Sequence, residues 1–452
     1  MIKLCIILQY SVRGETKMII DHHPFEVNDK GHLMIGGVDS LTLAEKYGTP
    51  LYVYDVGIIR KNARSFVQAF KDMNVQAKVA YASKAFSSIA MVQVAKQEGL
   101  CLDVVSEGEL YTALQADFPT ERIHLHGNNK SREEIKMAVD QNIGCIVIDN
   151  LYEIQLLEEI LQDENKTIDV LIRITPGIES NTHQYIMTGN EDSKFGFNLV
   201  NGQVDEAFRL LHNHEHIHLK GLHCHIGSQI FETDGFMVAV NLLFNQLEKW
   251  LDQTGFVPEV LNLGGGYGIR YTEEDEPLAY SIYAEKIAAA VKKNSDRLNI
   301  AMPEIWIEPG RSIVGNAGVS LYTIGSSKQI PDIRNYISVD GGMADNIRPA
   351  LYEAKYEAVL ANRAKEAPVD TVSIAGKACE SGDMLIWDLP LPEAGPGDVL
   401  AVFATGAYGF AMASNYNRFR RPAVVFVENG TDKQVVRRES VEDIVKNDLS
   451  YE

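Results

Sequence analysis

The chain has 452 residues, of which 45% are hydrophobic and 23% are charged, so two globular domains with sizeable cores are expected. Its 62 acidic side chains outnumber the 42 basic ones, and the formal net charge of −20 argues against a nucleic-acid partner. The five cysteines are dispersed and lack CxxC spacing, which favours a reducing cytoplasmic setting over a disulfide framework or a zinc site. Because no apolar run reaches membrane length, we expect no membrane partner.

The N-terminal residues contain a short apolar run, Leu4–Leu8, that is followed by charged residues and not by a small-residue cleavage site. Met18 is an alternative start of the protein. On that interpretation residues 1–17 form a poorly ordered extension.

Short apolar runs alternate with amphipathic stretches from about residue 57 onward. We interpret the runs as buried strands, at Lys78–Ala82, Leu100–Val105, Ile123–His126, Cys145–Ile148, Val170–Ile174, Leu219–His223, Val260–Leu263 and Ile305–Ile307. Between them, apolar residues recur at three and four positions in helix-like segments such as Ser131–Gln141, Leu151–Gln162, Phe236–Gln253 and Tyr280–Lys293. About eight strand–helix units in roughly 250 residues is the size of a (β/α)₈ barrel. A doubly wound sheet reads similarly, but polar and glycine-rich residues follow nearly every strand, which favours a TIM-like barrel over residues 57–310.

After Gly310 the pattern changes to short β-rich segments broken by Gly and Pro, which predicts an antiparallel β domain over residues 311–452. Its expected strands are Ser320–Ile324, Tyr336–Asp340, Thr371–Ala375, Asp398–Phe403 and Ala423–Glu428. Residues 18–56 precede the barrel, and we expect Phe25–Val27 and Leu33–Ile35 to add strands to this domain.

Lys84 stands at the end of an expected buried strand, where apolar walls would desolvate its amine and favour a neutral nucleophile that forms a Schiff base. A solvated cap is the alternative interpretation of this lysine. Polar residues also end three other expected strands. His225, followed by Gly227 and Ser228, can lie against a flat ring and bind an anion, although a core histidine is the plainer explanation.

Gly264, Gly265 and Gly266 follow the seventh expected strand, where barrels commonly bind phosphate, although a glycine run is often only a tight turn. Glu308 ends the eighth expected strand, and a carboxylate there can keep a pyridine nitrogen protonated; a solvated acid is the alternative. An amine, a ring-stacking imidazole, a glycine loop and a carboxylate on four strand ends together predict a pyridoxal phosphate site.

At these positions the sequence resembles the fold-type III, alanine-racemase-like family of pyridoxal phosphate decarboxylases, in its diaminopimelate-decarboxylating branch. The matching segments are Tyr81–Ala85, Gly221–Gln229, Gly264–Gly266, Glu308–Arg311, Asp340–Tyr352, Gly376–Asp383 and Gly406–Tyr408. Phe86 departs from the family, which often has Asn at that position.

The resemblance implies a role for each matching residue. Lys84 would be the Schiff-base lysine, His225 the ring-stacking residue and Glu308 the partner of the ring nitrogen, with Asp103 as an acid near the lysine and the histidine. The remaining cofactor-binding residues would be Ser228, Gly265, Gly266, Pro309, Gly310, Arg311 and Tyr408.

The C-terminal segments bear on the substrate. A carboxylate at the far end of the substrate needs a planar cation, which arginine supplies. The resemblance implies Arg311, Arg348, Tyr352 and Tyr408 as substrate-binding residues, and Glu380 as the residue that binds the distal ammonium. A surface salt bridge is the plainer interpretation of Arg348.

Cys379 is the expected proton donor, since a thiol with a reference pKa of about 8.5 is protonated at neutral pH yet able to release its proton. A buried inert thiol is the alternative. In this family the Cys379 segment reaches the partner's site, which implies a homodimer with composite active sites.

The resulting hypothesis is decarboxylation of meso-diaminopimelate at its D-centre to L-lysine and CO₂, the last step of lysine biosynthesis, with pyridoxal 5'-phosphate and no metal. Two alternatives remain: a decarboxylase of ornithine, arginine or carboxynorspermidine, and a catalytically dead homologue. The segment Glu179–Lys194 has the Ser, Asn, Thr and Gly content of a mobile lid.

Overall fold

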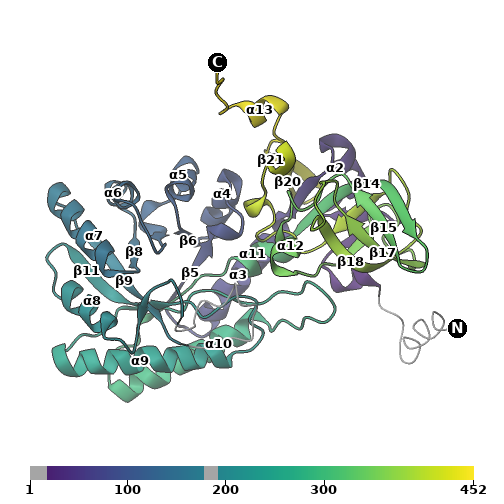
Figure 1. Ribbon diagram of the computed structural model, residues 1–452. Helices are drawn as coiled ribbons and strands as arrows, with labels where there is room; N and C mark the ends of the chain where they lie inside the picture. The colour runs from purple at the N-terminus through teal and green to yellow at the C-terminus, as the bar shows by residue number, and fades with distance from the viewer. Residues whose placement is uncertain (1–17, 178–191) are drawn as a thin grey trace.

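The computed structural model describes residues 18–177 and 192–452. The expected extension over residues 1–17 and nearly all of the expected lid, Glu179–Lys194, lie outside the described residues. Two bodies lie side by side, a barrel surrounded by helices and a sheet-rich domain to its right in Figure 1. None of the helices in the described ranges is both long enough and apolar enough to cross a membrane.

The first body is a closed eight-stranded parallel barrel, in agreement with the predicted fold class. Its strands are β5 (Ala77–Ala82), β6 (Cys101–Val104), β7 (Ile123–Leu125), β8 (Cys145–Ile148), β9 (Ile168–Thr175), β11 (Ile217–Cys224), β12 (Val260–Asn262) and β13 (Glu304–Ile307). The ring closes because β9 pairs with both β8 and β11, and β13 pairs with β5. A short strand, β10 (Phe197–Asn198), extends β9. All eight strands coincide with apolar runs of the sequence.

One helix precedes the first barrel strand, and the other helices of the barrel connect successive strands. In chain order the helices are α3 (Val56–Asp72), α4 (Ile89–Gln97), α5 (Glu107–Gln115), α6 (Arg132–Asp140), α7 (Leu151–Glu164), α8 (Gln203–Leu211), α9 (Asp234–Thr254) and α10 (Tyr280–Leu298). Ser88, Ser106, Ser131 and Asn150 accept backbone N–H groups at the first turns of α4 to α7. Such caps satisfy the free N–H groups at a helix start, so each helix begins within a few residues of its strand and leaves the strand end open to the cleft.

The second body is built on a nine-stranded sheet. Its strands are β4 (Leu51–Asp55), β14 (Gly318–Ile330), β15 (Arg334–Val339), β16 (Ala358–Leu360), β17 (Asp370–Ala375), β18 (Met384–Leu391), β19 (Val399–Val402), β20 (Ala423–Glu428) and β21 (Thr431–Val436). Most pairs are antiparallel, as predicted, but β15 pairs with β17 and β4 pairs with β20 in parallel. The short helices are α11 (Arg311–Val314), α12 (Arg348–Tyr352) and α13 (Val441–Val445).

The N-terminal residues join this domain in a different way from the one predicted. The strands β1 (Glu26–Val27), β2 (Leu33–Ile35) and β3 (Val38–Asp39) form a separate three-stranded sheet, followed by α2 (Ser40–Tyr47). This sheet packs on the β domain through a shared hydrophobic cluster that includes Leu33, Ile35 and Val427. The N-terminal strand that enters the large sheet is β4, which lies between β14 and β20.

Candidate active site

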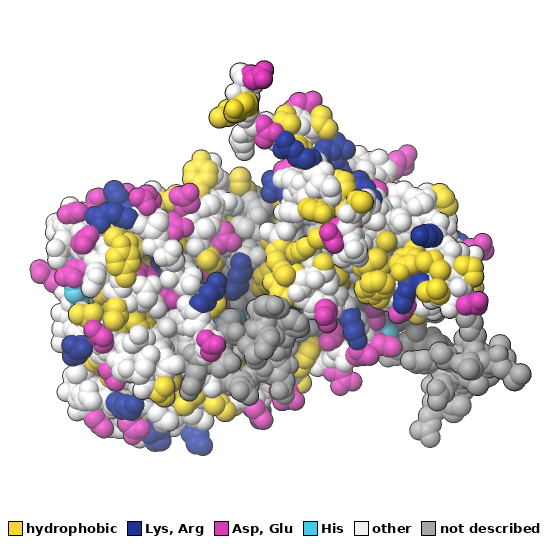
Figure 2. Space-filling view, in the orientation of Figure 1, with side chains coloured by type: hydrophobic (Ala, Val, Ile, Leu, Met, Phe, Trp, Pro, Cys, Tyr) yellow, Lys and Arg dark blue, Asp and Glu magenta, His cyan; other side chains and the backbone are white. Residues whose placement is uncertain are grey.

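A cleft of about 730 Å³ lies at the carboxyl ends of the barrel strands and extends to the β domain. Polar side chains line it from β6 and β11 and from the residues directly after β5 and β13 on the barrel side, and from α12 on the other. In Figure 2, acidic and basic side chains alternate over the visible face of both bodies. The lining of the cleft shows that polar groups on strand ends converge where barrel enzymes hold their substrates.

Lys84 lies in the short 3₁₀ turn Ser83–Ala85 directly after β5, and its side chain faces the cleft. The Ser83 hydroxyl donates to the carbonyl of Asp103 at 2.7 Å, and the Tyr81 hydroxyl donates to that of Phe86 at 2.8 Å, which fixes the backbone on both sides. The Lys84 side chain is exposed, so the expected desolvation of its amine is wrong: the cleft mouth is open at this position. Phe86, where the family often has Asn, is buried and stacks on Tyr54 with centroids 4.5 Å apart.

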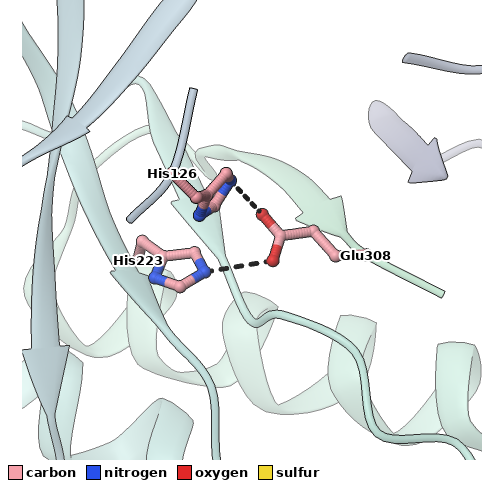
Figure 3. Close-up of side chains that lie close together, drawn as sticks. All are labelled: His126, His223 and Glu308. Carbon is pink, nitrogen blue, oxygen red and sulfur yellow. Dashed lines mark hydrogen bonds and ion pairs between the residues drawn. The ribbon is translucent and has the colours of Figure 1, made fainter. Parts of the chain in front are cut away.

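Glu308 follows β13 and is buried between two histidines. Its Oε1 lies 3.1 Å from His126 Nε2, and its Oε2 lies 3.1 Å from His223 Nε2 (Figure 3). The Asn262 side-chain amide also donates to Oε1 at 2.6 Å. Burial raises the pKa of Glu308, but the two imidazoles outweigh it and leave the pKa well below the ordinary value.

His126, His223 and Glu308 have a spacing that a metal ion could use, with ligand atoms within 4.8 Å of one another. Each carboxylate oxygen of Glu308 already contacts a donor, so an ion-paired carboxylate explains this arrangement without a metal.

Asp103 on β6 is a second buried carboxylate, and it lines the cleft together with Lys84. Its Oδ1 lies 3.7 Å from His126 Nε2 and has no hydrogen-bond partner among the described residues. Burial is the largest influence and raises its pKa to about 6.

His225 and the glycine loop contact each other at the floor of the cleft. The Gly265 N–H donates to His225 Nδ1 at 3.2 Å, and desolvation together with Lys84 lowers the pKa of His225 well below its usual value. A Cβ on Gly265 would lie 2.2 Å from the carbonyl oxygen of Glu308, and one on Gly266, at a φ of +106°, would lie 2.4 Å from that of Gly227. Only glycine fits at these two positions.

Two arginines form the cleft wall toward the β domain. Arg311 donates to the Ser228 hydroxyl at 2.9 Å and to the Tyr271 hydroxyl, and its guanidinium lies 4.9 Å from the ring centroid of Tyr408. Arg348, the first residue of α12, also contacts Tyr271, with its guanidinium 4.9 Å from the ring centroid. Burial raises the pKa of Tyr271, but the two guanidinium groups outweigh it and lower the pKa overall.

Arg348 also donates to the Tyr356 hydroxyl at 2.5 Å. Within the described ranges, the Nε atoms of Arg311 and Arg348 are buried without a hydrogen-bond partner. Tyr352 lines the same wall. A buried pair of cations with unused donors is suited to an anionic group of a ligand.

Pro309 and Gly310 join Glu308 to Arg311. The Pro309 carbonyl accepts from Ala82 N–H at 3.2 Å, and a Cβ on Gly310 would lie 3.0 Å from the Cβ of Ala82. These two residues hold the carboxylate loop against the end of β5.

Cys379 and Glu380 lie apart from the other predicted site residues. Both are exposed in the connection between β17 and β18, and neither lines the cleft of its own chain. The Asp383 carboxylate accepts from the Met343 and Ala378 N–H groups at 2.6 and 2.7 Å, which orders the loop.

Sequence reasoning missed the cleft residues His126, His223, Tyr271 and Arg173, the last of which lies 3.7 Å from Asp149. It also missed Asn262, which is buried and donates to Glu308. His126, His223 and Asn262 lie at the ends of expected strands, so the rule that selected Glu308 would also have selected them. Tyr271 lies in an irregular segment, and its pairing with two arginines has no local signal.

Comparisons with known proteins show the family of this chain. A family model described as "Pyridoxal-dependent decarboxylase, pyridoxal binding domain" matches residues 56–315. The diaminopimelate decarboxylase of Bacillus subtilis is 64% identical over 430 residues, covering 95% of this chain and 98% of the relative. That of Staphylococcus aureus is 48% identical, covering 93% and 98%.

Among solved structures, diaminopimelate decarboxylase from M. jannaschii in complex with L-lysine has a TM-score of 0.88 and 34% identity, covering 95% of this chain and 98% of the other. Fold and site therefore define a pyridoxal phosphate-dependent decarboxylase with a barrel and a β domain. Within this class, the chain belongs to the diaminopimelate decarboxylase family.

Proposed function

We propose that the cleft decarboxylates meso-diaminopimelate at its D-centre and releases L-lysine and CO₂, with pyridoxal 5'-phosphate bound to Lys84. The observation that supports this substrate is the buried pair Arg311 and Arg348 in the same cleft as Lys84 and Glu308. Diaminopimelate has a second amino-acid head, whose carboxylate would compensate two buried guanidinium groups. An ornithine-like substrate has no distal carboxylate and would leave them uncompensated.

The described residues fit the cofactor. The Lys84 amine is accessible in the cleft, Glu308 is buried where it can meet a ring nitrogen, and the Gly265–Gly266 backbone and Ser228 lie on the side where the phosphate would bind. When bound, pyridoxal phosphate supplies the electron sink that cleavage of a Cα–carboxylate bond requires. His225, with its lowered pKa, offers a neutral ring face for stacking.

The protein's own contribution is orientation and proton transfer. Arg311 and Arg348, with Tyr352 beside them, would hold the distal head and thereby set the scissile bond perpendicular to the ring. The Cys379 thiol would donate its proton to Cα after CO₂ has left, and Glu380 would bind the distal ammonium.

Cys379 and Glu380 can act in this way only if they come from a second copy of the chain, because both lie outside the cleft of their own chain. We therefore infer a homodimer with two composite sites. Exposed apolar side chains over the β domain support an interface there; Ile333, Val369 and Trp387 are 77%, 72% and 55% exposed (Figure 2).

The four cysteines of the described residues are free thiols, which supports a reducing cytoplasmic setting.

The test is CO₂ release by purified protein loaded with pyridoxal phosphate, compared between meso-diaminopimelate, ornithine, arginine and carboxynorspermidine. We expect turnover of meso-diaminopimelate to exceed that of the others by at least about a hundredfold, because a buried unpaired charge costs several kcal/mol. Lys84→Ala should abolish both activity and the absorbance of the lysine-bound cofactor. Preference for a substrate without a distal carboxylate would refute the proposed substrate, and retained absorbance in Lys84→Ala would refute the anchor.

A further inference from the structure

Glu308 is held by a set of buried donors from three other strands. His126 follows β7 and His223 lies on β11, and both point at the carboxylate that follows β13 (Figure 3). Asn262 ends β12 and donates to the same carboxylate. Each of these side chains is buried, with 0–6% of its surface exposed. Three buried polar side chains from three different strands therefore face one carboxylate.

The carboxylate is left with room for one more partner. A carboxylate offers about four acceptor positions, two on each oxygen. Asn262 donates to Oε1 at 2.6 Å and His223 Nε2 lies within hydrogen-bond distance of Oε2 at 3.1 Å, whereas His126 Nε2 contacts Oε1 at 3.1 Å as an ion pair without hydrogen-bond geometry. The remaining position on Oε2 is available to an N–H group of a ligand.

Asp103 provides a comparison within the same cleft. Both carboxylates are buried, but Asp103 lacks a donor on its Oδ1, and its pKa is raised to about 6, whereas the pKa of Glu308 is lowered. Burial lowers the pKa of His223, and a neutral imidazole with its proton on Nε2 would still donate to Glu308. The other ionisable groups that line the cleft around this cluster are Lys84, Asp103, Arg173 and His225.

We propose that His126 and His223 are positioning residues that fix the Glu308 carboxylate in its ionised form, with one lone pair of Oε2 directed at the cofactor's ring nitrogen. This inference rests on the proposed role of Glu308 as the partner of that nitrogen. Without the two donors, Glu308 would resemble Asp103: it would take up a proton more readily and lose its fixed orientation. A protonated Glu308 cannot keep the ring nitrogen protonated, so the two histidines set the charge of the cofactor ring without touching it.

The test reads the ring nitrogen directly, by ¹⁵N NMR of the holoenzyme loaded with ¹⁵N-labelled pyridoxal phosphate. In the wild type we expect the chemical shift of a protonated ring, unchanged between pH 6 and 9. The double variant His126→Phe/His223→Phe retains the rings but has no donors, and its shift should move toward that of a neutral pyridine as the pH rises. Its affinity for pyridoxal phosphate should fall by about tenfold, the equivalent of one charge-assisted hydrogen bond.

Two further variants separate positioning from packing. The double variant His126→Gln/His223→Gln restores an N–H donor on each side chain and should recover the wild-type shift. His124→Phe replaces another buried histidine on β7, which stacks on Trp306 at 4.3 Å instead of contacting Glu308, and should leave the shift unchanged. A wild-type shift in the Phe double variant, or an equal change in His124→Phe, overturns the inference.

Glu308→Gln distinguishes this inference from the proposed function. If Glu308→Gln leaves the shift unchanged, the proposed role of Glu308 is itself wrong. If it alters the shift and the Phe double variant does not, only the positioning role is wrong. Should the Phe variant fail to fold, ¹⁵N spectra of labelled histidines in the wild-type holoenzyme decide the question: both rings must be protonated at Nε2, and an Nδ1–H tautomer in either one contradicts the donor role.

Discussion

At the scale of single residues, some buried charges of the cleft contact partners that no local pattern reveals. Lys84, His225, Glu308, Arg311 and Arg348 could be selected from the sequence because each stands at a strand end or in a recognisable motif. Their partners could not all be found, because a pairing such as Tyr271 with Arg348 joins positions 77 residues apart through the packing of two bodies.

Tyr271→Phe tests whether this tyrosine orients the arginine pair. The change removes the hydroxyl that accepts from Arg311 and retains the ring under Arg348. We expect KM for meso-diaminopimelate to rise about tenfold with kcat changed less than threefold, since one hydrogen bond to a charged group is lost. Steady-state kinetics measure both constants. The nearby Tyr356→Phe, which removes a hydroxyl from Arg348 alone, is the matched comparison; an unchanged KM in both variants would show that the arginines need no orienting hydroxyl.

Asp345 should make the stability of the β domain depend on pH. Burial raises its pKa to about 7, so between about pH 4 and 7 the native state retains a proton that the unfolded chain has released. Stability therefore falls as the pH rises through this window, by up to about 4 kcal/mol for this group. Asp345→Asn retains an acceptor for the Gly342 N–H and removes the charge. Thermal unfolding should show the variant more stable than the wild type at pH 8 and not at pH 4, and an equal difference at both pH values would contradict the assignment.

At the scale of elements, the sequence was sufficient for the barrel because buried parallel strands are continuous apolar runs and their helices have a period of 3.6 residues. All eight strands lie on predicted runs. The β domain was harder to predict from the sequence. Its strands could be found, but two parallel pairings and the separate β1–β3 sheet depend on connections between distant segments, which alternation does not encode.

The glycine loop after β12 offers a prediction at this scale. Gly265→Ala would place a Cβ 2.2 Å from the Glu308 carbonyl oxygen, so the two loops must separate. We expect a loss of stability of about 1–3 kcal/mol and weaker binding of pyridoxal phosphate, measured by thermal unfolding and by titration of the apoenzyme. Gly108→Ala, in helix α5 with its nearest atom 3.8 Å away, is the matched control and should be neutral or stabilising by up to about 1 kcal/mol. If the Gly265→Ala variant is as stable as the wild type and binds pyridoxal phosphate as tightly, the glycine loop and the Glu308 loop tolerate separation.

At the scale of the whole molecule, the cleft brings the barrel and the β domain together around one ligand site, yet two of the expected residues lie on the outer surface of the β domain. Cys379 and Glu380 lie in the loop that Asp383 orders, and neither lines the cleft of its own chain. In a two-fold symmetric dimer, each surface loop would complete the cleft of the other chain, so both clefts would be complete.

Mixed dimers test this arrangement. Lys84→Ala lacks the anchor of its own cleft, and Cys379→Ala lacks the group that it would provide to its partner, so each variant alone should have little activity. Refolding an equal mixture should yield hybrids in about half of the dimers, each with one intact composite site, and therefore about a quarter of wild-type CO₂ release. Combining both substitutions in one chain and mixing it with wild type gives the control, in which each hybrid has both its sites damaged if they are composite. If mixing the single variants restores no activity while size-exclusion chromatography shows that hybrids have formed, Cys379 serves the cleft of its own chain and the composite site is wrong.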